Sequence, residues 1–406
     1  MIPLAEAQQA ILDTVVAGPT DRVSLDAAVG LVLARDVVAT ESVPPFANSA
    51  MDGFAVRAGD VAAATPDEPV GLVVVGEAAA GHLAGRAVGE GEAIRIMTGA
   101  PMPDGADAVV MVERTRPEGD RVLVGHAARV GEHVRDVGGD VAAGERVLDR
   151  GTELRPAHLG VLASIGVREV DVVARVRLGV LSTGDELVDE NRPLAPGEIR
   201  DSNRPMLLAL ARDAGCDAVD LGRIADDETL LERTLRAASI DCDAIVTSGG
   251  VSVGDYDVVK AVLGRVAAMR WWQVAIRPAK PLAFGMLDGT PVFGLPGNPV
   301  SSLVSFELFA RPALRQMMGH ASRFREELVA VASHDFSRAP DGKLHLDRVR
   351  LRWSDAGFRV DSTGVQASNA LAATAHANAL VLLPDGDGVR AGDEVRVLRL
   401  DGPCTR

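Results

Sequence analysis

Between residues 177 and 320, short apolar strands alternate with amphipathic helices. The strand-like segments are 178–181, 218–221, 244–246 and 292–295. Apolar residues at helical spacing occupy 204–213, 228–238, 258–266 and 300–318. This alternation predicts a doubly wound α/β domain with a largely parallel sheet. Because ligands bind at the carboxyl ends of the strands in such sheets, we expect the site in the turns that follow them.

Three of these strands run into glycine-rich polar turns, which are STGDEL (182–187), SGGVSVGDYD (248–257) and LPGNPVSS (295–302). Glycine lets backbone N–H groups approach an anion closely, and the serine hydroxyls add donors, so the turns favour phosphate binding. The candidate ligand-binding residues are Ser182, Ser248, Gly249, Gly250, Ser252, Pro296, Pro299 and Ser301. Glu186 and Asp257 adjoin these turns, where carboxylates beside phosphate predict a divalent cation such as Mg²⁺. Each turn alone is also compatible with an ordinary loop.

A fourth segment, 276–281, carries Arg277 and Lys280 between two prolines. Two cations three residues apart suit an oxyanion clamp, although solvated surface charge is the alternative. The chain has no GxxxxGK[ST], HExxH or GxSxG motif, which argues against an NTPase P-loop, a histidine-ligated metal and a serine-hydrolase elbow.

The remainder of the chain has a different character. Residues 46–140 are rich in glycine and short strands, and the strict alternation over 344–353 favours a small β-barrel-like domain. We therefore expect five segments: the first part of a linker domain (1–45), an inserted β-rich domain (46–140), the second part of the linker domain (141–176), the α/β domain (177–320) and a C-terminal β domain (321–406).

Composition excludes several classes of protein. The net charge of −15 argues against a nucleic-acid partner, which demands a basic surface. No run of about 18 apolar residues predicts a membrane span, and the N-terminus lacks the basic region of a signal peptide. Cys216, Cys242 and Cys404 form no CxxC pair, so neither a disulfide framework nor a zinc knuckle is expected. A cytoplasmic location fits these features.

Taken with further motifs, these turns resemble the molybdopterin molybdenumtransferase family, which comprises the MoeA proteins and the gephyrin E domain. The other matching motifs are PPFANSAMDGFA (44–55), IMTGAP (96–101), GADAVV (105–110), GEHVR (131–135) and IRDSN (199–203). The resemblance implies a homodimer that inserts molybdenum from molybdate into adenylylated molybdopterin, with Mg²⁺-dependent release of AMP. Alternatives are a non-catalytic pterin-binding paralogue and a dimeric scaffold protein of the gephyrin type.

The resemblance also implies residue roles. Asp257, Glu186 and Asp226 would be acids of the cleft, the first two of them next to Mg²⁺. Molybdate would be held by Arg277, Lys280, Ser301, Arg348 and Ser368. The inserted domain would supply Asp52, Thr98, Arg135 and Asp140 across the dimer interface, with Asp52 and Asp140 as catalytic acids.

Structural alternatives stand beside four of these roles. Asp52 could cap its own turn, Thr98 could lie in a plain turn, Asp140 could pair with Arg135, and Asp226 could be a helix N-cap. In addition, Arg277 and Ala279 stand where the family has Lys and Gly. Arg keeps the charge but presents a planar fork, and Ala adds a methyl group beside the ligand unless its φ is negative.

Overall fold

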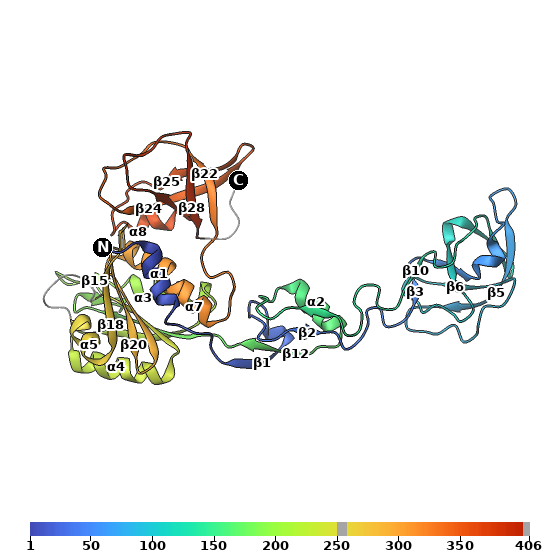
Figure 1. The fold of residues 1–406 in the computed structure, drawn as a ribbon, viewed down its shortest axis with the longest axis horizontal. Coiled ribbons are helices and arrows are strands. Elements are labelled where there is room, and N and C mark those ends of the chain that lie inside the picture. Colours follow the sequence, from blue (N-terminus) through green and yellow to red (C-terminus); the bar gives the residue numbers. More distant parts are fainter. Residues whose placement is uncertain (250–257, 401–406) are drawn as a thin grey trace.

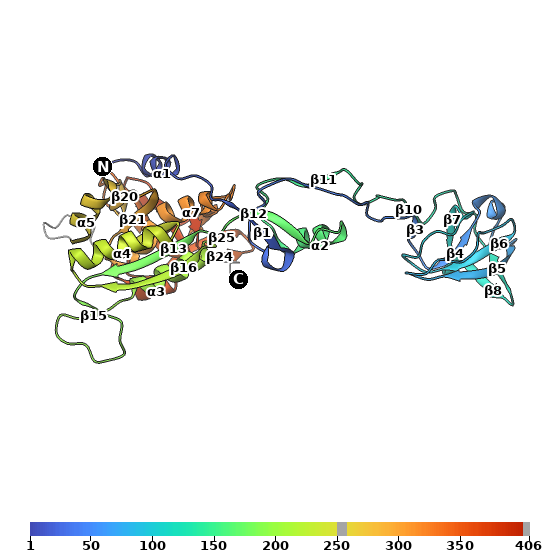
Figure 2. The same cartoon turned by 90° about the horizontal axis from the view of Figure 1, so that it is seen from below.

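The computed structural model describes residues 1–249 and 258–400. The molecule is elongated (Figure 1), with an α/β part and a β-barrel at one end and a β-rich part at the other. A narrow middle part joins the two ends, and Figure 2 shows the same separation from a second direction.

The α/β part is built on a six-stranded sheet with the order β16-β13-β17-β21-β20-β18. Four parallel strands come first, β16 (Asp217–Ile224), β13 (Arg177–Thr183), β17 (Ala244–Ser248) and β21 (Thr290–Leu295). Two antiparallel strands, β20 (Pro281–Leu287) and β18 (Ala268–Gln273), complete one edge. The polar turns therefore follow strands that lie side by side, as the sequence predicts.

Helices cover both faces of this sheet, because its strands are apolar on both sides. Val180 and Val246 pack with α1 (Leu4–Leu12), α3 (Asn203–Asp213) and α6 (Pro299–Ser305). Their neighbours Leu181 and Ile245 pack on the opposite face with α4 (Glu228–Asp241) and α5 (Val258–Val266). The predicted doubly wound arrangement is confirmed.

The long helix expected over 300–318 is divided into three segments. A π-helical turn, Phe306–Ala310, separates α6 from α7 (Arg311–Met317). Pro312 has no backbone N–H and so cannot make the ordinary α-helical bond to residue 308. The widened turn lies immediately before this proline, where the α-helical ladder must break.

The C-terminal part forms a closed five-stranded barrel, because β24 pairs with both β25 and β26. Around the barrel the order is β24 (Leu344–Ser354), β25 (Gly357–Ser362), β22 (Glu327–Ala332), β28 (Glu394–Arg399) and β26 (Ala379–Leu383). The barrel is lined by apolar residues such as Val349 and Val381, which confirms the predicted barrel. Its outer residues Leu346 and Leu380 share a core with the α/β part, so the two parts pack together.

The β-rich end holds a second six-stranded sheet, whose order is β7 (Ala108–Met111), β4 (Gly53–Val56), β6 (Glu92–Ile96), β5 (Val70–Ala78), β9 (Arg121–Val124) and β8 (Thr115–Glu118). Beside it, β3 (Asn48–Ser49) pairs with β10 (Val134–Arg135). The middle part consists of β1 (Thr20–Ser24) paired with β12 (Glu169–Val173), β2 (Val37–Val38) paired with β11 (Arg146–Leu148), and α2 (Pro156–Ser164).

Shorter elements complete the described chain. They are β14 (Leu187–Val188), β15 (Ile199–Arg200), β19 (Ile276–Arg277), β23 (Phe336–Ser337), β27 (Gly388–Val389), α8 (Leu371–Ala375) and the 3₁₀ turns Leu25–Ala27, Ala58–Val61 and Val112–Arg114. Among the described residues, no helix combines the length and apolarity that crossing a membrane requires. The expected domain boundaries stay a prediction.

Candidate functional site

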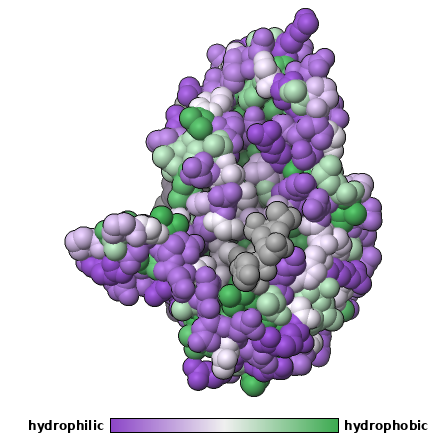
Figure 3. Space-filling view, turned by 90° about the vertical axis from the view of Figure 1, so that its left-hand side faces the viewer, coloured by the Kyte–Doolittle hydropathy of each residue, from purple (hydrophilic) through white to green (hydrophobic). Residues whose placement is uncertain are grey.

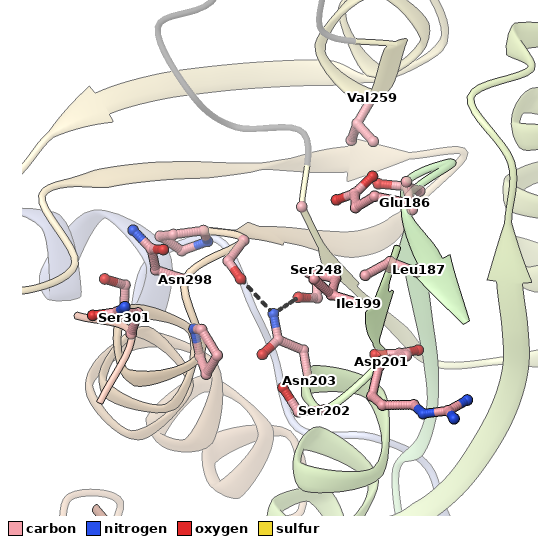
Figure 4. A pocket seen from close by; sticks show the side chains of 18 of the residues that line it. Glu186, Leu187, Ile199, Asp201, Ser202, Asn203, Ser248, Val259, Asn298 and Ser301 are labelled. Atoms are coloured by element: carbon pink, nitrogen blue, oxygen red, sulfur yellow. Dashed lines mark hydrogen bonds between the residues drawn. The ribbon is translucent and has the colours of Figure 1, made fainter. Parts of the chain in front are cut away.

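A cleft of about 760 Å³ opens at the carboxyl ends of the parallel strands. We call it the strand-end pocket, and Figure 4 shows its side chains converging from three turns. Seven residues selected from the sequence line it: Glu186, Asp226, Ser248, Gly249, Pro296, Pro299 and Ser301. Gly250, Ser252 and Asp257 lie outside the described residues, so their predicted roles stay predictions.

Asn203, at the start of α3, links two of these turns. Its side-chain nitrogen donates to the Ser248 hydroxyl at 2.7 Å and to the Gly297 carbonyl at 2.7 Å (Figure 4). The turn after β17 is therefore tied to the turn after β21. The sequence analysis placed Asn203 in the IRDSN motif but gave it no role in the site. The available sequence signal was an amide side chain directly before the predicted helix 204–213.

Ser182 does not line the strand-end pocket. Its hydroxyl is buried and donates to Asp201 Oδ2 at 2.5 Å, while Arg204 donates to the same oxygen at 3.1 Å. Asp201 does line the pocket. Ser182 thus supports the pocket wall through Asp201 instead of facing a ligand in this structure.

Glu186 and Asp226 bring exposed carboxylates into the pocket. Gly184 allows Glu186 to fold back, because a Cβ at this glycine would lie 2.5 Å from Glu186 Oε2. The N-cap of α4 is Asp227, whose side chain accepts from Leu230 N, so Asp226 is not the cap. Within 1–249 and 258–400, no three His, Cys, Asp or Glu side chains form a metal-binding group.

A second cleft, of about 840 Å³, adjoins the first at Pro281 and Ser301. We call it the barrel-mouth pocket, since residues of β24 and the loops at one end of the barrel line it. Arg277, Lys280 and Ser368 lie here, as the sequence-based hypothesis requires. The structure therefore brings the predicted oxyanion clamp next to the predicted phosphate-binding turns.

The basic side chains of the barrel-mouth pocket differ in their partners. Lys343 Nζ lies 2.7 Å from Asp341, His345 Nε2 lies 3.2 Å from the same carboxylate, and Arg338 donates to it at 2.9 Å. Arg277 and Lys280 are exposed and have no carboxylate partner in the described part of the chain. These two side chains are thus the ones available to an incoming anion.

Arg348 lies outside both pockets, contrary to its expected contact with the ligand. Its side chain is 0% exposed and donates to the carbonyl oxygens of Val365 and Ala367, at 2.7 and 3.2 Å. Its Nε and Nη1 atoms are buried without hydrogen-bond partners among the described residues. In this structure Arg348 holds the loop that leads to Ser368.

Ala279 adopts φ of 70°, in the left-handed region that favours glycine. Ala279 lines the barrel-mouth pocket, although the residue is only 2% exposed and packs in the α/β core. The methyl group therefore adds apolar contact at a position where the backbone conformation is unfavourable for alanine.

The strands β4, β6 and β10, which hold or adjoin Asp52, Thr98 and Arg135, lie at the far end of the molecule from the α/β part (Figures 1 and 2). Asp140 lies in the segment between β10 and β11, and none of the four residues lines either pocket. Asp52 Oδ1 accepts from the Thr98 backbone at 2.7 Å and from its hydroxyl at 2.8 Å, and these bonds lower the Asp52 pKa. Arg135 and Asp140 are exposed and form no ion pair with each other in the described chain. One copy of the chain does not unite them with the cleft.

Figure 3 views the α/β and barrel end of the molecule, where hydrophilic side chains dominate the surface and apolar residues are scattered. No large apolar area is visible on this face.

Comparison with known proteins gives three consecutive family matches. The MoeA N-terminal region (domain I and II) matches residues 2–166, the probable molybdopterin binding domain matches 179–316, and the MoeA C-terminal region (domain IV) matches 330–400. Molybdopterin molybdenumtransferase 2 of Mycobacterium tuberculosis is 42% identical over 404 residues, covering 98% of this chain and 99% of the relative. The chain belongs to the molybdopterin molybdenumtransferase (MoeA) family.

Other MoeA-family proteins agree. The molybdopterin molybdenumtransferase of Haemophilus influenzae is 37% identical over 93% of each chain. The crystal structure of the molybdopterin biosynthesis MoeA protein of Pyrococcus horikoshii OT3 superposes with a TM-score of 0.84 at 31% identity, over 98% of this chain and 100% of the other. The predicted family, the multidomain fold and the role of a transferase in molybdenum cofactor biosynthesis are thus confirmed.

Proposed function

We propose that this chain transfers molybdenum from molybdate to adenylylated molybdopterin and releases AMP. The observation that carries the proposal is the junction of two unlike pockets at Ser301 and Pro281. One pocket offers carboxylates, hydroxyls and glycine-rich backbone, and the other offers unpaired cations. A substrate with phosphates at one end and a metal-accepting group at the other can occupy both pockets together.

The strand-end pocket suits the phosphates and the adenylyl group. Backbone N–H groups of glycine-rich turns and a buried serine hydroxyl are good donors to phosphate oxygens. Asn203 fixes the distance between the Ser248 and Gly297 turns. Preorganised donors of this kind stabilise the charge that develops on phosphate oxygens when AMP leaves.

The residues of this pocket fit a magnesium ion. Mg²⁺ is usually bound through one or two carboxylates together with waters and substrate phosphates, so a cluster of three acids is not needed. Glu186 and Asp226 are two exposed carboxylates in the pocket, and they would hold the ion with Asp257 from the turn outside the described residues. When bound, the ion would neutralise negative charge on the phosphate oxygens.

The barrel-mouth pocket suits molybdate. A tetrahedral dianion is best held by charge-assisted hydrogen bonds from converging cations and hydroxyls. Arg277, Lys280, Ser301 and Ser368 line this pocket. Arg348 would act from beneath, by holding the loop before Ser368 in place.

The proposed reaction balances without a redox step. Two sulfur–molybdenum bonds form at the dithiol of the pterin, and one oxygen of molybdate leaves as water with the two thiol protons. A second water splits the phosphoanhydride, giving AMP and the phosphate ester of the metal-loaded pterin. Molybdenum keeps its oxidation state, so the protein has to position the two substrates, neutralise their negative charge and exclude competing reactions.

We also propose that the working form is a homodimer without nucleic acid. Arg135 and Asp140 are exposed far from the cleft of their own chain and have no ion-pair partners in the described residues. A two-fold arrangement of elongated chains would let the β-rich end of one copy approach the cleft of its partner. The predicted cytoplasmic location belongs to this proposal as well.

The test is an assay with purified protein, adenylylated molybdopterin and Mg²⁺, with and without molybdate. The proposal expects AMP release and molybdenum incorporation in equal amounts. A pterin-binding paralogue or a scaffold protein would bind the adenylylated pterin, or partner proteins, without molybdate-dependent release of AMP.

A further inference from the structure

One acid faces the barrel-mouth pocket without a partner. Asp347 lies on β24, opposite Val381 of β26 in the strand register. Directly opposed side chains share a face of the sheet, and Val381 and Val349 both belong to the barrel core. The Asp347 side chain is therefore on the inner face of the barrel, where apolar residues back it and the pocket lies in front. No hydrogen bond or ion pair of Asp347 is present in the described chain.

The charged and titratable groups around Asp347 come from several elements. Arg348 and His345 share its strand, Arg277 comes from β19, and Arg338 comes from the loop after β23. Lys280, Lys343 and Asp341 also line the pocket. Burial raises the pKa of Asp347, while the neighbouring cations act in the opposite direction. Lys343, His345 and Arg338 all contact Asp341, whereas Asp347 forms no ion pair with Arg277 and feels its charge from beyond ion-pair distance.

An oxyanion entering this pocket meets a conflict. An ionised carboxylate offers only acceptors, and the oxygens of a fully deprotonated oxyanion are also only acceptors. The two groups repel each other unless a proton lies between them. A dianion that binds to Arg277 and Lys280 cancels the positive charge that favours ionised Asp347, and its own charge also favours the neutral form of the acid.

We propose that Asp347 binds molybdate in its protonated form, donating a hydrogen bond to one oxygen, so that molybdate binding carries one proton into the barrel-mouth pocket. This inference rests on the proposed function and adds to it the uptake of one proton when molybdate binds. The proton comes from solvent and goes to a carboxylate oxygen, and no bond to molybdenum is formed or broken in the step. Asp347 is then a binding residue that distinguishes bare dianions from anions bearing their own proton, such as hydrogen phosphate.

The proposal fixes how molybdate binding depends on pH. If one proton is taken up on binding, the affinity for molybdate falls as pH rises, with a limit of about tenfold per pH unit. Asp347→Asn keeps a hydrogen-bond donor but cannot titrate, so it should bind molybdate with little dependence on pH.

Titration calorimetry of molybdate into the full chain, in two buffers of different ionisation enthalpy, counts the protons taken up. We expect uptake of up to about one proton by the wild type and by Asp361→Asn, a matched change on the barrel surface, and little uptake by Asp347→Asn. His345→Gln tests the other titratable group and should retain the uptake. Equal uptake by wild type and Asp347→Asn, or loss of uptake only in His345→Gln, overturns the proposal.

A second measurement needs no variant. The dissociation constant for molybdate in the wild type should rise between pH 6 and 8, and a constant value across this range contradicts the role of Asp347. Failure of the wild type to bind molybdate at any pH contradicts instead the oxyanion site in the proposed function, so the two failures are distinguishable.

Discussion

Asn203 and Ser248 are joined by a hydrogen bond of 2.7 Å, and the same amide nitrogen reaches the Gly297 carbonyl. A single side chain at the start of α3 thus sets the spacing of two turns that belong to different strands. The strand-end pocket depends on this spacing, since both turns line it.

Replacing Asn203 with Ala should weaken binding of adenylylated molybdopterin. Loss of the amide leaves the buried Ser248 hydroxyl without this donor, at a cost of about 1–3 kcal/mol, or about 5- to 150-fold in affinity if the turns separate. Equilibrium binding of adenylylated molybdopterin measures the effect. Asn369→Ala removes the same side chain at an exposed edge of the pocket and should change little. Equal affinity in a folded Asn203→Ala protein would contradict this role.

The two unpaired cations should control molybdate use. Arg277→Ala or Lys280→Ala should raise the KM for molybdate by at least about tenfold, because hydrogen bonds to charged groups contribute about 1.5–3 kcal/mol. Arg277→Lys keeps the charge and should retain most activity. Lys343→Ala removes a cation that is already paired with Asp341, so its effect should be under about threefold. A similar loss in all three alanine variants would argue for a general charge effect.

Carboxylates of the strand-end pocket should set the Mg²⁺ requirement. Glu186→Gln should raise the Mg²⁺ concentration needed for half-maximal AMP release by about tenfold or more, an effect typical of disturbed metal sites. Glu190→Gln, an exposed residue beside Arg192, is the matched control. An unchanged Mg²⁺ titration of Glu186→Gln would remove Glu186 from the metal site.

Stability should depend on pH through His320, which joins the middle part to α7. His320 Nδ1 lies 2.9 Å from Glu153, and burial followed by the charge of Arg315 lowers the His320 pKa from its ordinary 6.5 to about 4. The unfolded chain therefore takes up a proton near pH 6.5, whereas the folded chain does so only near pH 4. Stability should fall between these values, by up to about 3 kcal/mol.

Thermal midpoints measured at pH 7.5 and pH 5 test this expectation. The wild type should lose more stability on acidification than His320→Gln, whose side chain does not titrate. His126→Gln changes an exposed histidine at the β-rich end and should behave like the wild type. Parallel losses in wild type and His320→Gln would show that other groups govern the acid response.

Mixed dimers test whether two chains share one cleft. Arg135→Ala and Asp226→Asn should each be inactive alone, because they damage opposite ends of the molecule. A mixture should recover up to about a quarter of wild-type activity, since half of the dimers carry one intact cleft in a two-fold assembly. No recovery in a mixture shown to form mixed dimers would place Arg135 outside the active site.

The sequence predicted those features of the fold that depend on local patterns of apolar and polar residues. Alternation of strands and helices predicted the α/β sheet, in which β13, β17 and β21, the strands that lead into the three polar turns, lie side by side. The barrel followed from the alternation in β24. These features depend on periodicity and on the rule for strand ends, which need no knowledge of distant contacts.

Contacts between residues far apart in the sequence could not be predicted from periodicity. Arg348 was expected to touch the ligand, but the barrel packs on the α/β part and buries its side chain against the 365–367 loop. Ser182 was expected to face the ligand and instead bonds Asp201, 19 residues away. Periodicity gives the face of a strand on which a side chain lies, but it does not identify the element packed against that face.

The most direct test of the account compares wild type with the Arg277→Ala/Lys280→Ala double variant at saturating Mg²⁺. AMP release from adenylylated molybdopterin should require molybdate in the wild type. The double variant should bind the adenylylated pterin normally yet release AMP only at greatly increased molybdate concentrations. AMP release by the wild type without molybdate, or an unchanged molybdate requirement in a folded double variant, would contradict the division of labour between the two pockets.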